Sequence, residues 1–172
     1  MTAEAPPVTI ARIEAQVFRV PLERPVATSF GTMRDRPAVF VRVDDAEGAF
    51  GWGEVFANWP AAGAEHRARL LMEDLGDLVL GSEARAPSDL FHALDGKTRI
   101  RALQCGERGP FAQVIAGLDI ALHDLFARRA GVPLARFLDP SAAATVAAYA
   151  SGIHVAAAPR AIGEARAAGH RA

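Results

Sequence analysis

The feature that most constrains the fold is a change in the spacing of apolar residues near residue 60. Before this point apolar and polar residues alternate, as where Ile13, Ala15 and Val17 are separated by Glu14 and Gln16. This period of two is typical of a half-buried β-strand. After it, apolar residues recur every three or four positions, as on one face of a helix. Strands followed by helices predict an α+β domain with an antiparallel sheet.

Three strands are expected in the first part, at residues 9–20, 39–43 and 50–56. Pro21 should end the first strand, and the polar residues 44–48 should join the other two as a hairpin. The result is a three-stranded antiparallel meander. Such a sheet needs helices on one face to be stable.

The segment between the first two strands, residues 23–36, shows neither period. Its centre reads Thr28, Ser29, Phe30 and Gly31. An irregular loop of this length within a compact domain is usually functional. We therefore predict a binding loop here.

A helical bundle should follow. We expect one continuous helix over residues 64–80, a second that begins with Ser88 as its N-cap, and a third over residues 111–126. The first presents a single apolar stripe, with charged residues on its other side. The apolar residues of the stripe are Ala68, Leu71, Met72, Leu75, Leu78 and Val79, and the charged ones are Glu65, Arg67, Arg69, Glu73 and Asp77.

The last part of the chain has a different pattern. Residues 145–151 predict a short apolar strand, and residues 159–168 a helix that Gly169 ends. A strand followed by a helix is half of a βαβ unit. The sequence thus predicts an α+β domain over residues 1–139 and the opening unit of an α/β domain over residues 140–172.

Composition excludes several classes of function. Hydrophobic residues make up 51% and charged residues 23%, as in globular domains with a core. The 19 basic and 20 acidic side chains leave a net charge of −1, which disfavours nucleic-acid binding. We also expect no membrane span, no signal peptide and, with Cys105 as the single cysteine, no internal disulfide. These features favour a cytoplasmic protein.

Four motifs occur in order along the chain: Gly51-Trp52-Gly53-Glu54, AGLDIALHDL at 116–125, GVPLARFL at 131–138 and VAAYASG at 146–152. Together they resemble the mandelate racemase / muconate lactonizing enzyme family of the enolase superfamily. The resemblance extends over residues 9–172 and implies the amino-terminal capping domain followed by the first βα unit of a truncated TIM-type barrel. His123 replaces a usual Trp and Asp139-Pro140 a usual Gly-Gly, both in structural positions.

The resemblance implies a reaction whose catalytic residues lie in the barrel. In the family, a base removes the proton alpha to a carboxylate, and Mg²⁺ stabilises the resulting enediolate. The usual base is a lysine on the second barrel strand, which would begin near residues 170–172. Lys97 is the only lysine and lies in the capping domain. We therefore expect no catalytic residue and no metal ligand in this chain.

The resemblance further implies that two capping-domain segments, 23–36 and 55–63, form a lid over a carboxylate-bearing substrate such as an acid sugar or hydroxy acid. The run NWPAAGAEHR at 58–67 is similar to acid-sugar members. The candidate substrate contacts are Thr28, Ser29 and Phe30 in the first segment, Asn58 and Trp59 in the second, and His154 after the first barrel strand. The alternatives are that Phe30 and Trp59 only pack the loops and that His154 is solvated.

Asp119 and His123 are spaced i, i+4 on the third helix, as metal ligands can be. No third ligand is evident, so a polar contact to the barrel is favoured over a metal site.

Two functions remain open. The first is the lid of a Mg²⁺-dependent acid-sugar dehydratase or racemase/cycloisomerase, homo-oligomeric at full length, with this chain inactive by itself. The second is a stand-alone binding or interaction domain, or the partner of a separate barrel chain. The reading frame after the codon for Ala172 distinguishes them, because the first requires a Lys-x-Lys motif downstream.

Overall fold

The computed structural model describes residues 7–29, 31–151 and 157–171. They form two compact units, Met1–Phe137 and Leu138–Ala172. Each unit is described by itself.

The first unit contains an antiparallel sheet with the strand order β3-β2-β1-β4. Its strands are β1 (Val8–Thr28), β2 (Gly31–Asp45), β3 (Phe50–Val55) and β4 (Glu83–Ala84). The expected three-stranded meander and the α+β class are confirmed, and β4 adds a two-residue edge beside Val8 and Thr9. Helices cover the face that carries Ile13, Val41 and Val43, all of which are buried.

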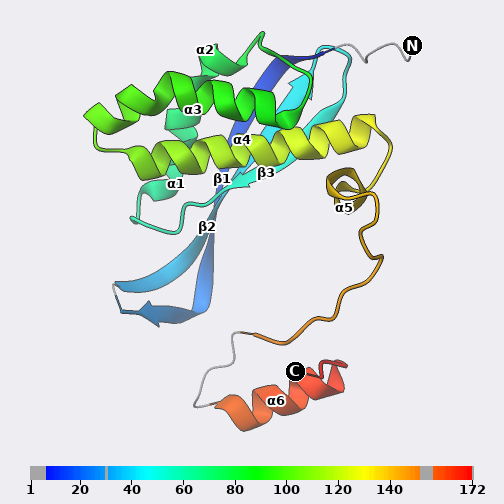
Figure 1. The fold of residues 1–172 in the computed structure, drawn as a ribbon. Helices are drawn as coiled ribbons and strands as arrows, with labels where there is room; N and C mark the ends of the chain where they lie inside the picture. Colours follow the sequence, from blue (N-terminus) through cyan, green and yellow to red (C-terminus); the bar gives the residue numbers. More distant parts are fainter. Residues whose placement is uncertain (1–6, 30, 152–156, 172) are drawn as a thin grey trace. The chain divides into compact units, whose positions relative to one another are not determined.

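The prediction of an irregular loop over residues 23–36 is wrong. Here β1 and β2 continue as a long β-hairpin, which we call the hairpin arm (residues 20–29 and 31–36), and it projects beyond the helices of this unit (Figure 1). Within the described part of the arm only Met33 is buried. An alternating apolar pattern arises only where one face of a strand is covered. Because neither face of the arm is covered along its length, its residues do not alternate between apolar and polar, and the sequence did not predict strands there.

The paired register of the arm changes between Pro21 and Val26. Pro21 lies opposite Asp35, and Val26 lies opposite Met33, so β1 advances five residues while β2 advances two. Extra residues of this kind bend and twist a strand. The arm thus has an irregularity close to its base.

The helix expected over residues 64–80 is interrupted. It consists of α1 (Gly63–Arg69), the π-helical segment η1 (Leu70–Leu75) and α2 (Gly76–Val79). A π-helical turn rotates the following residues relative to an ideal α-helix. Met72, within η1, is consequently 43% exposed instead of lying in the apolar stripe. Arg67 precedes η1 and also differs from prediction: it was expected on the solvent side, but it is only 4% exposed because it contacts Gln113 of α4.

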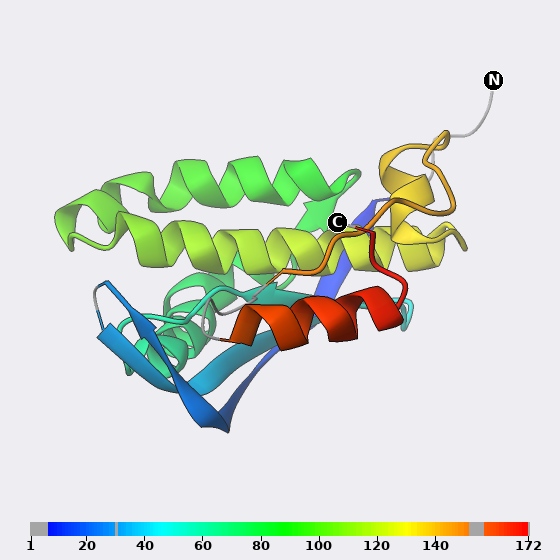
Figure 2. The same cartoon turned by 90° about the horizontal axis from the view of Figure 1, so that it is seen from below.

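Two longer helices form the outer layer: α3 (Pro87–Gln104) and α4 (Arg108–Arg129), which lie side by side in both views (Figures 1 and 2). Ser88 is not the N-cap of α3, because Pro87 is already helical. Instead the Asp89 carboxylate accepts hydrogen bonds from the backbone amides of Arg85 and Ala86, each at 2.9 Å. The short helix α5 (Leu134–Leu138) follows the turn at Gly131.

Helix α4 packs directly on β3. A Cβ atom at Gly51 would lie 2.1 Å from the carbonyl oxygen of Ala121, and one at Gly53 would lie 2.1 Å from that of Gly117. Only glycine permits such an approach. By length and composition α4 could also cross a membrane, but its most apolar window is half buried in this unit. That burial is the pattern of a core helix.

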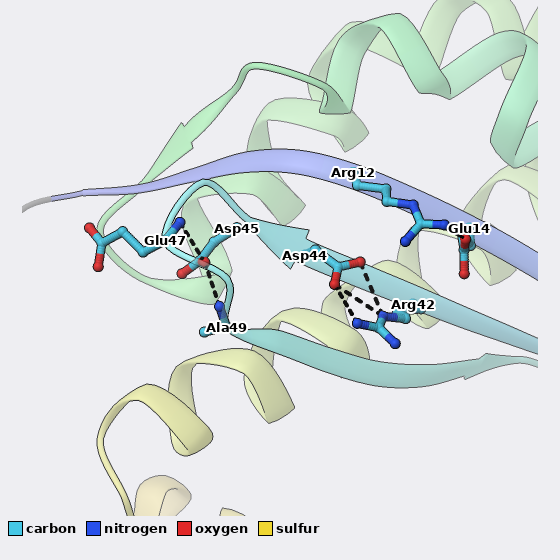
Figure 3. Close-up of polar contacts among 7 residues, drawn as sticks. All are labelled: Arg12, Glu14, Arg42, Asp44, Asp45, Glu47 and Ala49. Carbon is cyan, nitrogen blue, oxygen red and sulfur yellow. Dashed lines mark hydrogen bonds and ion pairs between the residues drawn. The ribbon is translucent and has the colours of Figure 1, made fainter.

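The turn between β2 and β3 is organised by Asp45, whose side chain is 1% exposed. One carboxylate oxygen accepts hydrogen bonds from the amides of Glu47, at 2.9 Å, and Ala49, at 2.8 Å (Figure 3). The other oxygen pairs with Arg129 at the end of α4. Asp45 therefore links the turn to the helix layer.

In the second unit, α6 (Ala158–Ala167) begins with Pro159 in its first turn, and Gly169 follows it at a φ of 93°. This helix matches the prediction. The strand expected at residues 145–151 is not formed. A strand is stabilised by hydrogen bonds to a neighbouring strand, and no described residue pairs with this segment.

Candidate functional site

The two segments expected to form a lid meet at one pocket in the first unit. This pocket has a volume of about 190 Å³ and lies between the base of the hairpin arm and the loop that joins β3 to α1 (residues 56–62, here the β3–α1 loop). Its lining residues are Arg19, Thr32, Met33, Arg34, Asp35, Asn58, Trp59 and Ala61. Asn58 and Trp59 thus lie where the sequence placed a contact surface.

Trp59 also packs against the arm. A Cβ atom at Gly31 would lie 2.8 Å from Cη2 of Trp59 and 3.3 Å from its Cζ3. The indole therefore rests on the backbone of β2 at a position that has no side chain. Trp59 lines the pocket and packs one segment on the other, so the packing role is present in this structure, and its contact with substrate stays a prediction. The Trp59–Pro60 peptide bond is cis.

Thr28 and Ser29 do not line this pocket. Thr28 Oγ1 donates a hydrogen bond of 2.7 Å to the carbonyl oxygen of Gly31, which closes the turn at the tip of the arm. Ser29 is exposed at the same turn. Phe30 and His154 lie outside the described residues.

Arg19 is a pocket residue that the sequence analysis did not single out. Its Nε and Nη2 donate to the two carboxylate oxygens of Glu65, each at 2.7 Å, and its Nη1 donates to Asp35 Oδ1 at 2.8 Å. Nη2 also donates to the carbonyl oxygen of Ala61. One guanidinium group therefore joins β2, the β3–α1 loop and α1.

The ionisation of these groups follows from their contacts. The hydrogen bonds from Arg19 lower the pKa of Glu65 to about 2, and those to Glu65 and Asp35 raise the pKa of Arg19. The signal for Arg19 was present in the sequence. It continues the alternation of Ile13, Ala15 and Val17, so a charged residue stands where the pattern calls for an apolar one.

A larger pocket of about 600 Å³ lies between α1, η1 and the ends of α3 and α4. Its lining residues are Ala62, Glu65, His66, Arg69, Leu70, Asp74, Arg101, Cys105, Glu107 and Phe111. Two polar pairs lie within it: His66 Nε2 lies 2.7 Å from Glu107 Oε1, and the oppositely charged Arg101 and Asp74 lie 3.5 Å apart. Cys105, the single cysteine, is exposed.

Arg67, next to this pocket, is buried without a direct carboxylate contact. Its guanidinium group donates to Gln113 Oε1 at 2.8 and 2.9 Å and to the carbonyl oxygen of Gly63 at 3.3 Å. Burial lowers the pKa of Arg67 because the charged form loses hydration. Arg67 thus ties α1 to α4.

The comparison with protein families decides the assignment of this fold. The model of the mandelate racemase / muconate lactonizing enzyme, N-terminal domain, matches residues 12–139. The chain belongs to this family. It corresponds to the capping domain of the enolase superfamily, in which Gly51 and Gly53 of the first motif allow α4 to pack on β3.

Solved structures and curated relatives agree. A mandelate racemase/muconate lactonizing enzyme from Bordetella bronchiseptica RB50 is 46% identical with a TM-score of 0.80, over 94% of this chain and 41% of that chain. An enolase from Bradyrhizobium, complexed with magnesium and mandelic acid, is 28% identical with a TM-score of 0.63, over 80% and 36%. The 3,6-anhydro-alpha-L-galactonate cycloisomerase of Streptomyces coelicolor is 29% identical over 84% of this chain and 38% of its own length. The chain thus spans about two fifths of these relatives.

The family implies a magnesium ion, and the described residues do not fit one. Among them no group of three His, Cys, Asp or Glu side chains is arranged to hold a metal. His123 Nδ1 lies 2.8 Å from the backbone oxygen of Asp119 and 3.5 Å from its carboxylate, so the two residues contact each other within the helix. No described residue is assigned as a ligand.

Proposed function

We propose that this chain is the lid of a Mg²⁺-dependent enolase-superfamily enzyme that removes a proton alpha to a carboxylate. The pocket at the junction of the hairpin arm and the β3–α1 loop supports this role. In it, two segments that are distant in sequence present side chains to one small space. A lid of this kind excludes water and contacts the part of the substrate remote from the reacting carbon.

The chemistry of the pocket favours a neutral, hydroxylated group. Thr32 and Asn58 supply hydrogen-bond donors and acceptors, and the indole of Trp59 supplies a flat apolar wall. Two arginines and two carboxylates lie in or beside the pocket, so its charges balance: Arg19, Arg34, Asp35 and Glu65. Acid sugars carry such hydroxyl groups beyond their carboxylate. The name of the Streptomyces relative, a cycloisomerase of an anhydrogalactonate, supports the same class.

The chemical step is assigned to parts of the enzyme other than this chain. Lys97 lies in α3 of the capping domain, and the described residues form no metal site. We therefore propose that the isolated chain is inactive. The full-length protein would be a lyase or isomerase, cytoplasmic and homo-oligomeric, with the substrate carboxylate and Mg²⁺ held by a barrel.

A chimera tests this proposal. This chain replaces the corresponding segment of the Bordetella protein, and exchange of the alpha proton is followed by NMR in deuterated water with Mg²⁺ and a panel of acid sugars and hydroxy acids. We expect exchange by the chimera and none by the isolated chain. Asn58→Ala and Trp59→Leu in the chimera should raise KM, while Trp52→Phe, which alters the other tryptophan, should not.

Two results would contradict the proposal. Exchange by the isolated chain would place catalytic groups within it. A folded chimera without activity on any substrate of its Bordetella parent would favour a stand-alone binding domain or the partner of a separate chain. The first unit has a hydrophobic core of its own, as a stand-alone domain requires.

A further inference from the structure

We propose that Arg19 is the positioning residue that holds the two lid segments in one arrangement. Arg19, Asp35, the Ala61 carbonyl and Glu65 form what we call the Arg19 clamp. The inference rests on the proposed function, because holding the two segments together affects catalysis only if they form a lid. The clamp itself is a property of this chain and can be measured without any enzyme activity.

The first observation is the reach of one side chain. Arg19 projects from the helix-covered face of β1, beyond Val17, at the edge of the hydrophobic core. From there it contacts Asp35 at the base of the arm and Ala61 in the β3–α1 loop. Its bidentate pair with Glu65 fixes the plane of the guanidinium group relative to α1.

The second observation is that few described residues of the arm are buried. Its described residues are exposed except for Met33 and a few half-buried positions, and its register is irregular between Pro21 and Val26. Few buried contacts and an exposed hydrogen-bond ladder allow local opening without global unfolding. The clamp lies between this irregularity and the core, because Asp35 pairs with Pro21 on the core side of the register shift.

The third observation connects the clamp to the pocket. Arg19 and Asp35 line the pocket together with Asn58 and Trp59, and Trp59 rests on Gly31 of the arm. Any movement of the arm relative to the loop therefore changes the pocket and the surroundings of the indole. A lysine in place of Arg19 keeps the charge but offers one nitrogen, which cannot meet Glu65, Asp35 and Ala61 at the same time.

The experiment uses the 172-residue chain with Trp52→Phe, so that Trp59 is the only tryptophan. Amide hydrogen exchange is read in two groups, residues 31–35 of the arm and residues 39–43 of the core strand. Trp59 emission reports on the loop. We expect Arg19→Gln to speed exchange in the arm by about fivefold or more and to shift Trp59 emission, with residues 39–43 unchanged.

Variants of the individual partners of Arg19 should separate its effect on the exchange of the arm from its effect on Trp59 emission. Asp35→Asn should loosen the arm and, because Trp59 rests on Gly31, also shift Trp59 emission. Glu65→Gln should shift Trp59 emission and leave the exchange of the arm nearly unchanged. Arg19→Lys should resemble Arg19→Gln, and adding Glu65→Gln to Arg19→Gln should change nothing further. Arg12→Gln is the matched control, because Arg12 lies on the same strand, is exposed and pairs only with Glu14 among the described contacts.

Either of two results would overturn the proposal. One is unchanged arm exchange and unchanged Trp59 emission in Arg19→Gln. The other is equal acceleration in residues 31–35 and 39–43, which would make Arg19 a general stabiliser of the unit. If Arg19→Gln does not fold, Arg19→Lys decides by the same criteria. Failure of the chimera alone would remove the lid function and leave the clamp intact.

Discussion

Gly53 of β3 and Gly117 of α4 pack backbone against backbone. A Cβ atom at Gly53 would lie 2.1 Å from the Gly117 carbonyl oxygen, and one at Gly117 would lie 2.4 Å from Cγ2 of Val55. Since the obstructing atom at Gly53 belongs to the backbone, it cannot turn aside as a side chain could. The two glycines therefore set the distance between the sheet and the helix layer.

We accordingly expect Gly53→Ala to lower the free energy of unfolding by about 3 kcal/mol or more, or to prevent folding. The measurement is urea denaturation followed by circular dichroism. Gly96→Ala is the control, because Gly96 is exposed within α3 and has open space around it. That variant should gain about 1 kcal/mol from helix propensity. A Gly53→Ala protein as stable as wild type would show that the helix can shift freely.

Removal of the Asp45 carboxylate should destabilise the first unit. Asp45→Ala leaves the amides of Glu47 and Ala49 without their acceptor and Arg129 without its buried partner. The expected loss is about 2 to 4 kcal/mol, measured by chemical denaturation. Glu47→Gln removes the exposed partner of the same arginine and should change stability by less than about 0.5 kcal/mol. Equal losses of unfolding free energy in Asp45→Ala and Glu47→Gln would show that the Asp45 carboxylate does not link the turn to the helix layer.

The Arg19–Glu65 pair should make stability depend on pH in the acid range. The pKa of Glu65 is about 2 in the folded chain against an ordinary value of 4.5. The folded state thus favours the carboxylate, so the contribution is complete above about pH 4.5 and is lost as the pH falls toward 2. Asp35 and Arg69 also face this pair, from β2 and from α1.

The comparison is between wild type and Glu65→Gln, by urea denaturation from pH 7 to pH 3. The difference in unfolding free energy should be about 1 kcal/mol or less at pH 7, because the Glu65 side chain is 45% exposed, and it should shrink on acidification. NMR titration of the Glu65 carboxyl group is the direct check. A titration midpoint of Glu65 at its ordinary pKa of 4.5 would show that Arg19 and Glu65 do not pair in solution.

Gly31→Ala should displace Trp59. The added methyl group would meet Cη2 of the indole at 2.8 Å, and the side chain can turn aside without unfolding the core. With Trp52→Phe as the background, we expect a shift of Trp59 emission and a loss of stability of less than about 1 kcal/mol. Ser29→Ala, at the same exposed turn, should shift neither quantity. Identical spectra for the two variants would mean that Trp59 does not rest on the arm.

The sequence predicted the strands and helices that have one face covered along their length by a neighbouring element. The alternation around Ile13 to Val17 and the helical spacing of α4 both report such a face, and both elements formed, although β1 continues beyond Pro21, which was expected to end it. Four motifs in order predicted the family, and for the glycine motif the structure supplies the reason in the contact between Gly53 and Gly117. For the site, Asn58 and Trp59 were found from the resemblance, whereas Arg19 was not.

By itself, then, the sequence determined the α+β class and the order of the helices and the first three strands, because these follow from local periodicity, and its motifs indicated the two segments that line the pocket of about 190 Å³. Only the tertiary structure decided that the described residues of the hairpin arm pair as strands, that Arg67 is buried and that Arg19 joins Asp35, Ala61 and Glu65. The contacts of Arg19 with Asp35 and Glu65 and of Arg67 with Gln113 join residues 16 to 46 positions apart. Spacing along the chain carries no record of a partner that distant, so the fold had to bring the partners together.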